Sequence, residues 1–342
     1  MARSASALRR AAPISISTHK RRTLPARGAH RRTQSAFPPN VSPKDISRLT
    51  ESDWRDLLET IDEGACTPFL GAGANSGILP LGEDLAKEWA TEYKFPFPDK
   101  IDLPQVSQYV AITKDNPLWP KQQLLRSFRK QASNLNFSDA LKPESPLSVL
   151  SELPFAVYMT TNYDDFLHQA LRLKGKAPQL ELCRWNPTVR ERFESAFKNR
   201  AFVATTSTPV VFHLHGYQSD PQSIVLTEDD YYSFLTKMSE LKLPPRIEEA
   251  WNGSSLLFIG YRLADLSFNV LFRMSFRNID RSNRFSSLAV QLPPEDNEPA
   301  KEYLGKYFSK SLIKIYWGDA TEFATELRER WTRHKGLRKQ KA

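Results

Sequence analysis

Short apolar runs alternate with stretches of helical periodicity from residue 45 onward. The apolar runs lie at 66–70, 155–160, 209–214, 255–259, 285–292 and 312–317. Apolar positions at helical spacing predict helices over 46–61, 81–93, 164–173, 227–238, 265–276, 301–308 and 320–331, with two more over 104–135. The tetrad 227–230, Thr-Glu-Asp-Asp, has a helix-capping pattern. Residues 174–208 predict irregular structure.

Strands that alternate with helices are typical of βαβ units and a mostly parallel sheet that is covered on both faces. The sequence therefore predicts an α/β fold, a Rossmann-like doubly wound sheet with helical insertions. We expect a disordered basic arm over 1–44, a domain over 45–332 with a helical insert at about 94–150, and a basic tail over 333–342. Parallel sheets bind ligands beyond the carboxyl ends of their strands. Polar residues follow predicted strands at 71–76, 160–164, 215–216 and 260–265.

A glycine turn follows the first predicted strand, with the sequence Gly71-Ala72-Gly73-Ala74-Asn75-Ser76-Gly77. Gly71 permits a tight turn, and Gly73 lets the backbone approach a diphosphate at the start of a helix. The match to the dinucleotide fingerprint G-x-G-x-x-G is imperfect, because Ser76 occupies the place of the third glycine. No acidic residue follows in a recognisable ribose-binding strand, which disfavours a hydride-transferring dehydrogenase. A plain turn between strand and helix stays an alternative.

The second predicted strand ends in Thr160-Thr161-Asn162-Tyr163-Asp164. Asp164 has a simple structural explanation, since an aspartate near a helix start acts as a cap. Asn162 could be a turn residue, but its amide both donates and accepts hydrogen bonds and would suit a neutral carboxamide or a positioned water.

Three histidines lie within the predicted domain. His168 falls inside a helix, where we expect a polar surface position. His213 and His215 end a strand, and the two-residue period of a strand predicts that they point to the same side. A His-x-His pair also allows a metal site, but no third ligand lies near it in the sequence. Because histidine ordinarily titrates near neutrality, His215 is the predicted general base.

Charge and composition limit the classes of function. The chain carries a formal net charge of +9, yet residues 1–44 contribute ten basic residues and no acid, and residues 333–342 contribute five more. The predicted domain is therefore mildly acidic, and nucleic acid is an expected partner only through the basic ends. The acid-free arm also resembles an organellar transit peptide. Two cysteines exclude a disulfide scaffold, and no apolar run is long enough to span a membrane.

Taken together and in order, the four polar sites resemble the sirtuin superfamily, and more closely its zinc-free NAD-hydrolase branch found in bacterial antiviral defence. The matching segments are Gly71-Ala72-Gly73, Thr161-Asn162-Tyr163-Asp164, His215-Gly216, Ser223–Tyr231 and Gly260-Tyr261-Arg262-Leu263-Ala264-Asp265. This resemblance covers roughly residues 60–275 and implies that 45–332 is a sirtuin-like Rossmann domain. Sirtuin deacylases carry four zinc-binding cysteines, which this chain cannot supply, and Leu81 stands after Pro80 where they carry aspartate.

The resemblance implies an NAD glycohydrolase, a hydrolase of N-glycosyl bonds that releases nicotinamide and ADP-ribose, with NAD as substrate and no metal. It implies catalytic roles for His215, Asn162 and Asp164. The NAD-binding residues that it implies are Gly71, Ala72, Gly73, Ser76, Thr161, Gly260 and Asp265. A non-catalytic sensor of NAD or ADP-ribose and an NAD-dependent protein deacylase are the alternatives.

An enzyme that consumes NAD requires control, so we expect an activating protein partner or a homo-oligomer. We expect a cytoplasmic location without a membrane anchor, and the composition of the arm leaves a mitochondrial location as the alternative.

Overall fold

The computed structural model describes residues 49–99, 101–133, 136–238, 240–262, 286–294 and 297–341. The chain divides into two units, Met1–Val41 and Ser42–Ala342, and every described residue belongs to the second. The helix expected over 265–276 and Asp265 itself lie outside the described residues.

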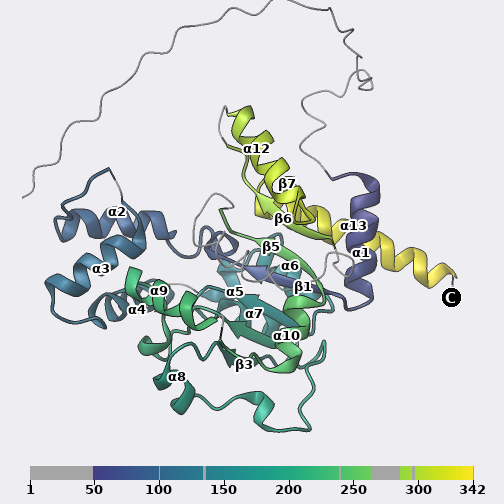
Figure 1. The fold of residues 1–342 in the computed structure, drawn as a ribbon. Helices are drawn as coiled ribbons and strands as arrows, with labels where there is room; N and C mark the ends of the chain where they lie inside the picture. The colour runs from purple at the N-terminus through teal and green to yellow at the C-terminus, as the bar shows by residue number, and fades with distance from the viewer. Residues whose placement is uncertain are drawn as a thin grey trace, which may run out of the picture. The chain divides into compact units, whose positions relative to one another are not determined.

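Seven strands of the described chain form one sheet in which every pairing is parallel (Figure 1). They are β1 (Cys66–Leu70), β2 (Val157–Thr160), β3 (Gln179–Leu182), β4 (Val210–His213), β5 (Ser255–Ile259), β6 (Ser287–Gln291) and β7 (Ile313–Trp317). Their order is β3-β4-β2-β1-β5-β6-β7, so strands β2–β4 lie on one side of β1, with β4 between β2 and β3, and strands β5–β7 follow in order on the other side. This arrangement confirms the predicted doubly wound α/β fold and puts its switch point between β1 and β5.

Helices occupy most of the connections. They are α1 (Glu51–Asp62), α2 (Gly82–Glu92), α3 (Leu103–Thr113), α4 (Trp119–Ser133), α5 (Phe137–Ala140), α6 (Pro146–Glu152), α7 (Phe166–Leu173), α8 (Pro187–Arg192), α9 (Glu228–Met238), α10 (Pro245–Asn252), α12 (Glu298–Ser309) and α13 (Ala320–Lys341), with short 3-10 turns η2 (Ala72–Asn75), η3 (Ala196–Lys198) and η4 (Pro221–Ser223). The capping pattern at 227–230 is confirmed, because the Asp230 N–H donates to the Thr227 hydroxyl and the Thr227 N–H donates to the Asp230 carboxylate.

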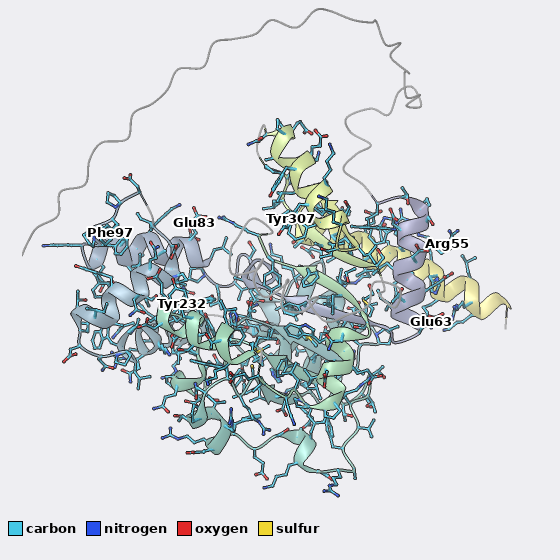
Figure 2. All side chains as sticks on the ribbon, in the orientation of Figure 1. Arg55, Glu63, Glu83, Phe97, Tyr232 and Tyr307 are labelled. Carbon is cyan, nitrogen blue, oxygen red and sulfur yellow. The ribbon has the colours of Figure 1, made fainter. Side chains whose placement is uncertain are left out.

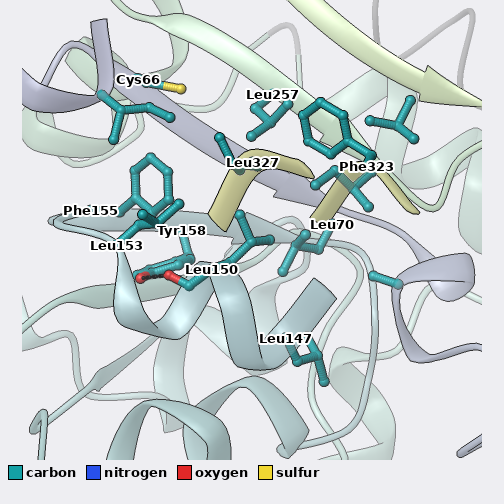
Figure 3. Close-up of a cluster of buried hydrophobic side chains, with 14 of the residues drawn as sticks. Cys66, Leu70, Leu147, Leu150, Leu153, Phe155, Tyr158, Leu257, Phe323 and Leu327 are labelled. Carbon is teal, nitrogen blue, oxygen red and sulfur yellow. Dashed lines mark hydrogen bonds between the residues drawn. The ribbon is translucent and has the colours of Figure 1, made fainter. Parts of the chain in front are cut away.

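Alternate residues of each central strand enter two different cores. In β5, Leu257 and Ile259 join a core with α1, α6, α7 and α13, whereas Leu256 and Phe258 join a core with α9, α10 and α12. Figure 3 shows part of the first core, where Leu150 and Leu327 lie near the strands. Burial on both faces explains why the strands read as continuous apolar runs in the sequence.

A third, smaller core holds the helical insert together. Leu85 and Trp89 of α2, Val106 of α3 and Leu124 of α4 pack with Leu226. In contrast, α6 packs on α7 and α13 and contributes Leu147 and Leu150 to the first core. The insert that packs as a unit is thus α2–α4, which begins earlier and ends earlier than the predicted range of 94–150.

Two parts of the pattern differ from expectation. The segment 174–208 contains the edge strand β3, whose outer neighbour is missing and whose first residues are only half-buried, so its apolar signal is weak. Helix α13 continues past residue 331 to Lys341, because Lys335 and Arg338 pair with Asp62 of α1 and hold its basic end.

The large exposed side chains Phe97 and Tyr232 lie on separate elements (Figure 2). No helix in the described ranges has the length and apolarity to cross a membrane.

Candidate active site

Four loops meet at the carboxyl edge of the sheet, because β4, β2, β1 and β5 are consecutive strands in it. The Gly71 N–H donates to the Ile259 carbonyl over 2.9 Å, which joins the loop after β1 to the end of β5. The Thr161 N–H donates to the Leu70 carbonyl over 3.0 Å, and the Leu214 N–H donates to the Thr160 carbonyl over 2.8 Å. Backbone hydrogen bonds therefore connect each loop to its neighbour, and the sequence sites at 71–76, 160–164, 215–216 and 260 come together.

The glycines of two loops pack against each other across the switch point. A Cβ on Gly260 would lie 2.2 Å from the Ala74 nitrogen, and one on Gly71 would lie 2.6 Å from the Gly260 carbonyl oxygen. Gly260 also has φ +81°, a conformation that side chains disfavour. Close contact between the two loops thus accounts for Gly71, Gly73 and Gly260, while a diphosphate contact at Gly73 stays a prediction.

Beyond this contact, the glycine turn opens toward solvent. Ala72 and Ser76 are exposed, whereas Ala74 and Asn75 are buried. The roles of Ala72 and Ser76 in holding a diphosphate and ribose are consistent with that exposure and remain predictions.

Asn162 is held in place by its neighbours. Its N–H donates to the Thr160 hydroxyl over 3.0 Å, and its side-chain amide donates to the Gly71 carbonyl over 3.1 Å. The side-chain amide of Asn162 therefore contacts the glycine turn. The oxygen of the side-chain amide can still accept from a substrate or water, because only Nδ2 takes part in the bond to Gly71.

Asp164 and Asn75 form a buried polar pair behind the glycine turn. The Asn75 amide donates to the Asp164 carboxylate over 2.7 Å, and the Phe166 N–H donates to its other oxygen over 3.0 Å. Burial raises the pKa of Asp164 to about 6. None of the described residues offers a donor to the buried side-chain oxygen of Asn75. The sequence reasoning did not select Asn75, although it belongs to the quoted glycine turn.

His215 is buried beside helix α9. Its ring packs edge-on against Tyr231 and Phe234, with centroid distances of 5.4 and 5.1 Å. Burial lowers its pKa to about 3, so the expectation that it titrates near neutrality is wrong. At neutral pH the ring is therefore uncharged, with one nitrogen that donates and one that accepts a hydrogen bond. The buried Nε2 of His215 has no hydrogen-bond partner among the described residues.

His213 and His215 point to different sides, so the expectation from strand alternation is wrong. Strand β4 ends at His213, and Gly216 turns the chain with φ +93°, so the two-residue period does not extend to His215. The His213 ring lies in parallel with that of His168 of α7, 5.5 Å away. His168 is only 2% exposed, and it is a core residue rather than the polar surface residue expected.

Two tyrosines connect the loops in a way that the sequence did not reveal. The Tyr261 hydroxyl donates its single hydrogen to the Leu70 carbonyl over 2.8 Å, so the Thr161 hydroxyl, 3.0 Å away, is the donor to Tyr261. Burial raises the pKa of Tyr261, and the neighbouring Tyr231 adds to the rise. Tyr231 also contacts His215, which brings the ends of β2, β4 and β5 to a common neighbourhood.

A pocket of about 540 Å³ opens beside the start of α7, where it is bounded by the lining residues Leu79, Phe128, Arg129, Asp164, Asp165, Phe166, Gln169, Tyr217, Gln218 and Ser219. Of the predicted site residues that the structure describes, only Asp164 lines it. A second hollow of about 490 Å³ shares Phe166 and Gln169 with the first. The convergence of His215 and Asn162 on one substrate stays a prediction.

Within the described ranges, no group of three or more histidine, cysteine, aspartate or glutamate side chains could hold a metal ion. The pairing of His213 with His168 and the aromatic surroundings of His215 also separate the two histidines of the His-x-His motif. Among the described residues, these two histidines therefore do not form a shared pair of ligands.

Residues 156–313 match the family model of the SIR2-like domain. The matched range begins just before β2 and ends at the start of β7, so it includes Asn162, Asp164, His215 and Gly260, while the glycine turn lies upstream of it.

Proteins of several bacteria are similar to this chain. NAD(+) hydrolase ThsA of Enterococcus faecium is 27% identical over 216 residues, which are 60% of this chain and 39% of that protein. ThsA of Cytobacillus dafuensis is 24% identical over 86% of this chain and 59% of its own length. ThsA of Bacillus cereus (strain MSX-D12) is 26% identical over 81% of this chain and 56% of its own length. The chain thus spans about two fifths to three fifths of the curated relatives that it matches.

Proposed function

We propose that this chain is an NAD hydrolase that cleaves the bond between nicotinamide and ribose. The observation that carries the proposal is the meeting of the Asn162, Asp164 and His215 loops with the glycine turn at the carboxyl edge of a SIR2-like sheet. The similar proteins named NAD(+) hydrolase ThsA support the same reaction.

The proposed reaction needs a water molecule and no redox partner. The bond between C1′ of the ribose and the ring nitrogen breaks, and its electron pair neutralises the cationic nicotinamide ring, which leaves. Water adds to C1′ and releases a proton, so the products are nicotinamide, ADP-ribose and H⁺. The transition state resembles an oxocarbenium ion, and catalysis consists of positioning and charge stabilisation.

The proposed roles follow from the charge state of each residue. Asp164 has a pKa of about 6, so most of it is ionised at pH 7.5, and its carboxylate favours the positive charge that develops on the ribose. Neutral His215 offers Nε2, which no described residue satisfies, to a ribose hydroxyl or to water. Because its pKa is about 3, His215 acts as an acceptor that orients the hydroxyl, and the released proton passes on to solvent.

Asn162 completes the proposed site at the glycine turn. Its amide donor is used by the Gly71 carbonyl, so its side-chain oxygen would orient the attacking water or the substrate carboxamide. Thr161, Ala72, Gly73, Ser76, Gly260 and Asp265 would bind the remainder of NAD.

The test is chromatography of NAD after incubation with the full chain and with His215→Gln and Asn162→Asp, since both substitutions keep the side chain close to its original size, and Asn162→Asp replaces the amide with a carboxylate that cannot donate. We expect nicotinamide and ADP-ribose from the wild type and at least a 100-fold loss in each variant. His334→Gln and Asn252→Asp are matched controls, because both residues lie toward the amino ends of the strands, next to Asp62 and just before β5. Circular dichroism checks that each variant is folded.

Three outcomes distinguish the alternatives. Calorimetric binding of NAD without turnover favours a non-catalytic sensor, and consumption of NAD only with an acyl-lysine peptide favours a deacylase. Full turnover by both His215→Gln and Asn162→Asp contradicts the assignment of the site.

We also propose a cytoplasmic role in antiviral defence, with activity controlled by a protein partner or by self-assembly. Nucleotide binding other than NAD and contact of the basic ends with nucleic acid are not needed for this role. Mass spectrometry of the protein from cells tests the location, because a mature chain that begins near residues 35–45 would favour mitochondrial import instead.

A further inference from the structure

Two buried histidines lie behind Asn162, and neither has a role in the reaction proposed above. His213 ends β4 and is 1% exposed, and His168 of α7 is 2% exposed. Their Nε2 atoms are 3.3 Å apart, and the Nδ1 of His213 lies 2.9 Å from the backbone carbonyl oxygen of Asn162. A continuous line of hydrogen bonds thus runs from α7 through the end of β4 to the candidate catalytic loop.

These distances assign the hydrogen on each ring. A carbonyl oxygen only accepts, so Nδ1 of His213 must carry the hydrogen that is donated to Asn162. Burial lowers the pKa of His213 to about 3 and that of His168 to about 4, so both rings are neutral at pH 7. The Nε2 of His213 therefore carries a lone pair, and the Nε2 of His168 must donate to it. The opposite arrangement would direct the Nδ1 lone pair of His213 at the Asn162 carbonyl oxygen.

The bond from His213 fixes Asn162 from a side that its other contacts do not reach. The Asn162 N–H and side-chain amide bind Thr160 and Gly71, which belong to β2 and to the turn after β1. His213 is the anchor on β4, the strand that also leads to His215 two residues later. One residue therefore ties the position of the Asn162 loop to the strand that carries the second candidate catalytic group.

We propose that His213 is a positioning residue for Asn162, and that His168 holds His213 in the tautomer that this role requires. The inference rests on the proposed NAD hydrolysis, and it concerns how the amide is held rather than which bond is broken. Tyr217 packs on both rings, with centroids 4.8 Å from His213 and 5.8 Å from His168, and restricts their rotation. Burying two neutral imidazoles costs free energy unless both of these hydrogen bonds are made, so a substitution of either His213 or His168 should disturb the arrangement.

Two substitutions of His213 separate positioning from packing. In His213→Asn the side-chain amide reaches the place of Nδ1 and can still donate to Asn162, whereas in His213→Gln the amide reaches the place of Nε2 and cannot. We expect His213→Gln to lower kcat for NAD roughly 10–100-fold with little change in KM, and His213→Asn to recover most of it. A packing role alone predicts the reverse order, because glutamine fills the space of the ring better.

His168 is tested through the same pair. His168→Leu removes the donor to Nε2 of His213 and leaves its tautomer unassigned, so we expect kcat to fall. In the His213→Asn background, the same change should have little further effect, since asparagine has no tautomer to hold. Additive losses in the double variant would overturn the role of His168. His334→Asn and His334→Gln are controls for histidine substitution at the opposite edge of the sheet.

Nitrogen-15 NMR of imidazole-labelled protein gives a readout that does not depend on turnover. We expect the Nδ1–H tautomer at His213 and the Nε2–H tautomer at His168 in the wild type, and loss of the first preference in His168→Leu. A wild type that fails to consume NAD refutes the proposed function and leaves the tautomers to be decided by NMR. An Nε2–H tautomer at His213, or equal kcat for His213→Asn and His213→Gln in an active protein, refutes the positioning role.

Discussion

Replacing Asp164 with asparagine is expected to stabilise the protein at neutral pH while it abolishes activity. The carboxylate is buried with Asn75 and the start of α7 as its hydrogen-bond partners. Asparagine keeps the size of the side chain and an oxygen that can accept from the Phe166 N–H. Rotation of the Asn75 amide by half a turn would present its now unpartnered oxygen to the new amide. The substitution thus removes a buried charge with little change in packing.

The magnitude follows from the pKa of Asp164, which rises from 3.8 to about 6 on folding. Between these values the folded state holds a proton that the unfolded state has released, so this group makes the protein less stable as the pH rises from about 4 to 6. Above pH 6 the free-energy cost of keeping the ionised Asp164 carboxylate buried is constant and amounts to about 3 kcal/mol. The advantage of Asp164→Asn over wild type should therefore be near zero at pH 4 and reach at most about 3 kcal/mol at pH 7.5.

The assay is urea unfolding of both proteins at pH 4, 5, 6 and 7.5, followed by circular dichroism. The buried histidines also respond to acid, but they are the same in both proteins and cancel in the difference. Asp165→Asn is the matched control, because this half-buried neighbour accepts a hydrogen bond from the Gln169 side chain at the surface of α7. A difference that does not vary with pH, or a wild type that is the more stable protein at pH 7.5, would refute the reasoning.

Three further outcomes are expected. The kcat/KM for NAD should fall below about pH 6 as Asp164 is protonated, and a wild-type pH–rate profile that stays flat from pH 7.5 down to pH 5 would refute this role of Asp164. Gly260→Ala should destabilise the fold by at least about 1–3 kcal/mol in urea unfolding, because its φ is +81° and the new Cβ would meet the Ala74 nitrogen at 2.2 Å. Lys121→Met should lower the free energy of unfolding by about 1–3 kcal/mol, because it removes the cation that pairs with the Asp230 carboxylate at 2.7 Å. Hydrogen exchange over Ser223–Tyr231 should rise at the same time. Unchanged exchange would show that the insert does not hold this segment.

The prediction for Lys121→Met also concerns the candidate site, because further hydrogen bonds connect the insert to the segment Ser223–Tyr231. The Gln108 side chain and Asp229 exchange two hydrogen bonds, and the Tyr163 hydroxyl donates to the Val225 carbonyl over 2.7 Å. The Val225 N–H in turn donates to the carbonyl of His215. Helices α3 and α4 are therefore joined to the backbone of the candidate catalytic histidine through this segment.

The sequence by itself determined the architecture and the place of the site. Strands buried on both faces must be apolar throughout, so β1 and β5 could be located to the residue, and the alternation with helices specified a parallel sheet. The edge strand β3 escaped detection because it has a neighbour on one side only and lacks that continuous apolar signal. Polar residues after successive strands pointed to Asn162 and His215 as candidates, since parallel strands bring their carboxyl ends to one edge, whereas the role of Asp164 came only from the resemblance to sirtuins.

Only the tertiary structure decided the chemical state of those residues. The pKa of a side chain depends on what surrounds it, and the rings that bury His215 come from α9, a separate element 16 and 19 residues further along the chain. The alternation of strand side chains failed at His215 because the strand had already ended. Gly71 and Gly73 contact Gly260, which is 189 and 187 residues away in the sequence, so only the folded structure could show that these glycines serve the contact between loops. Periodicity records which face of an element is buried, whereas hydrogen bonds and burial between distant elements exist only once the chain has folded.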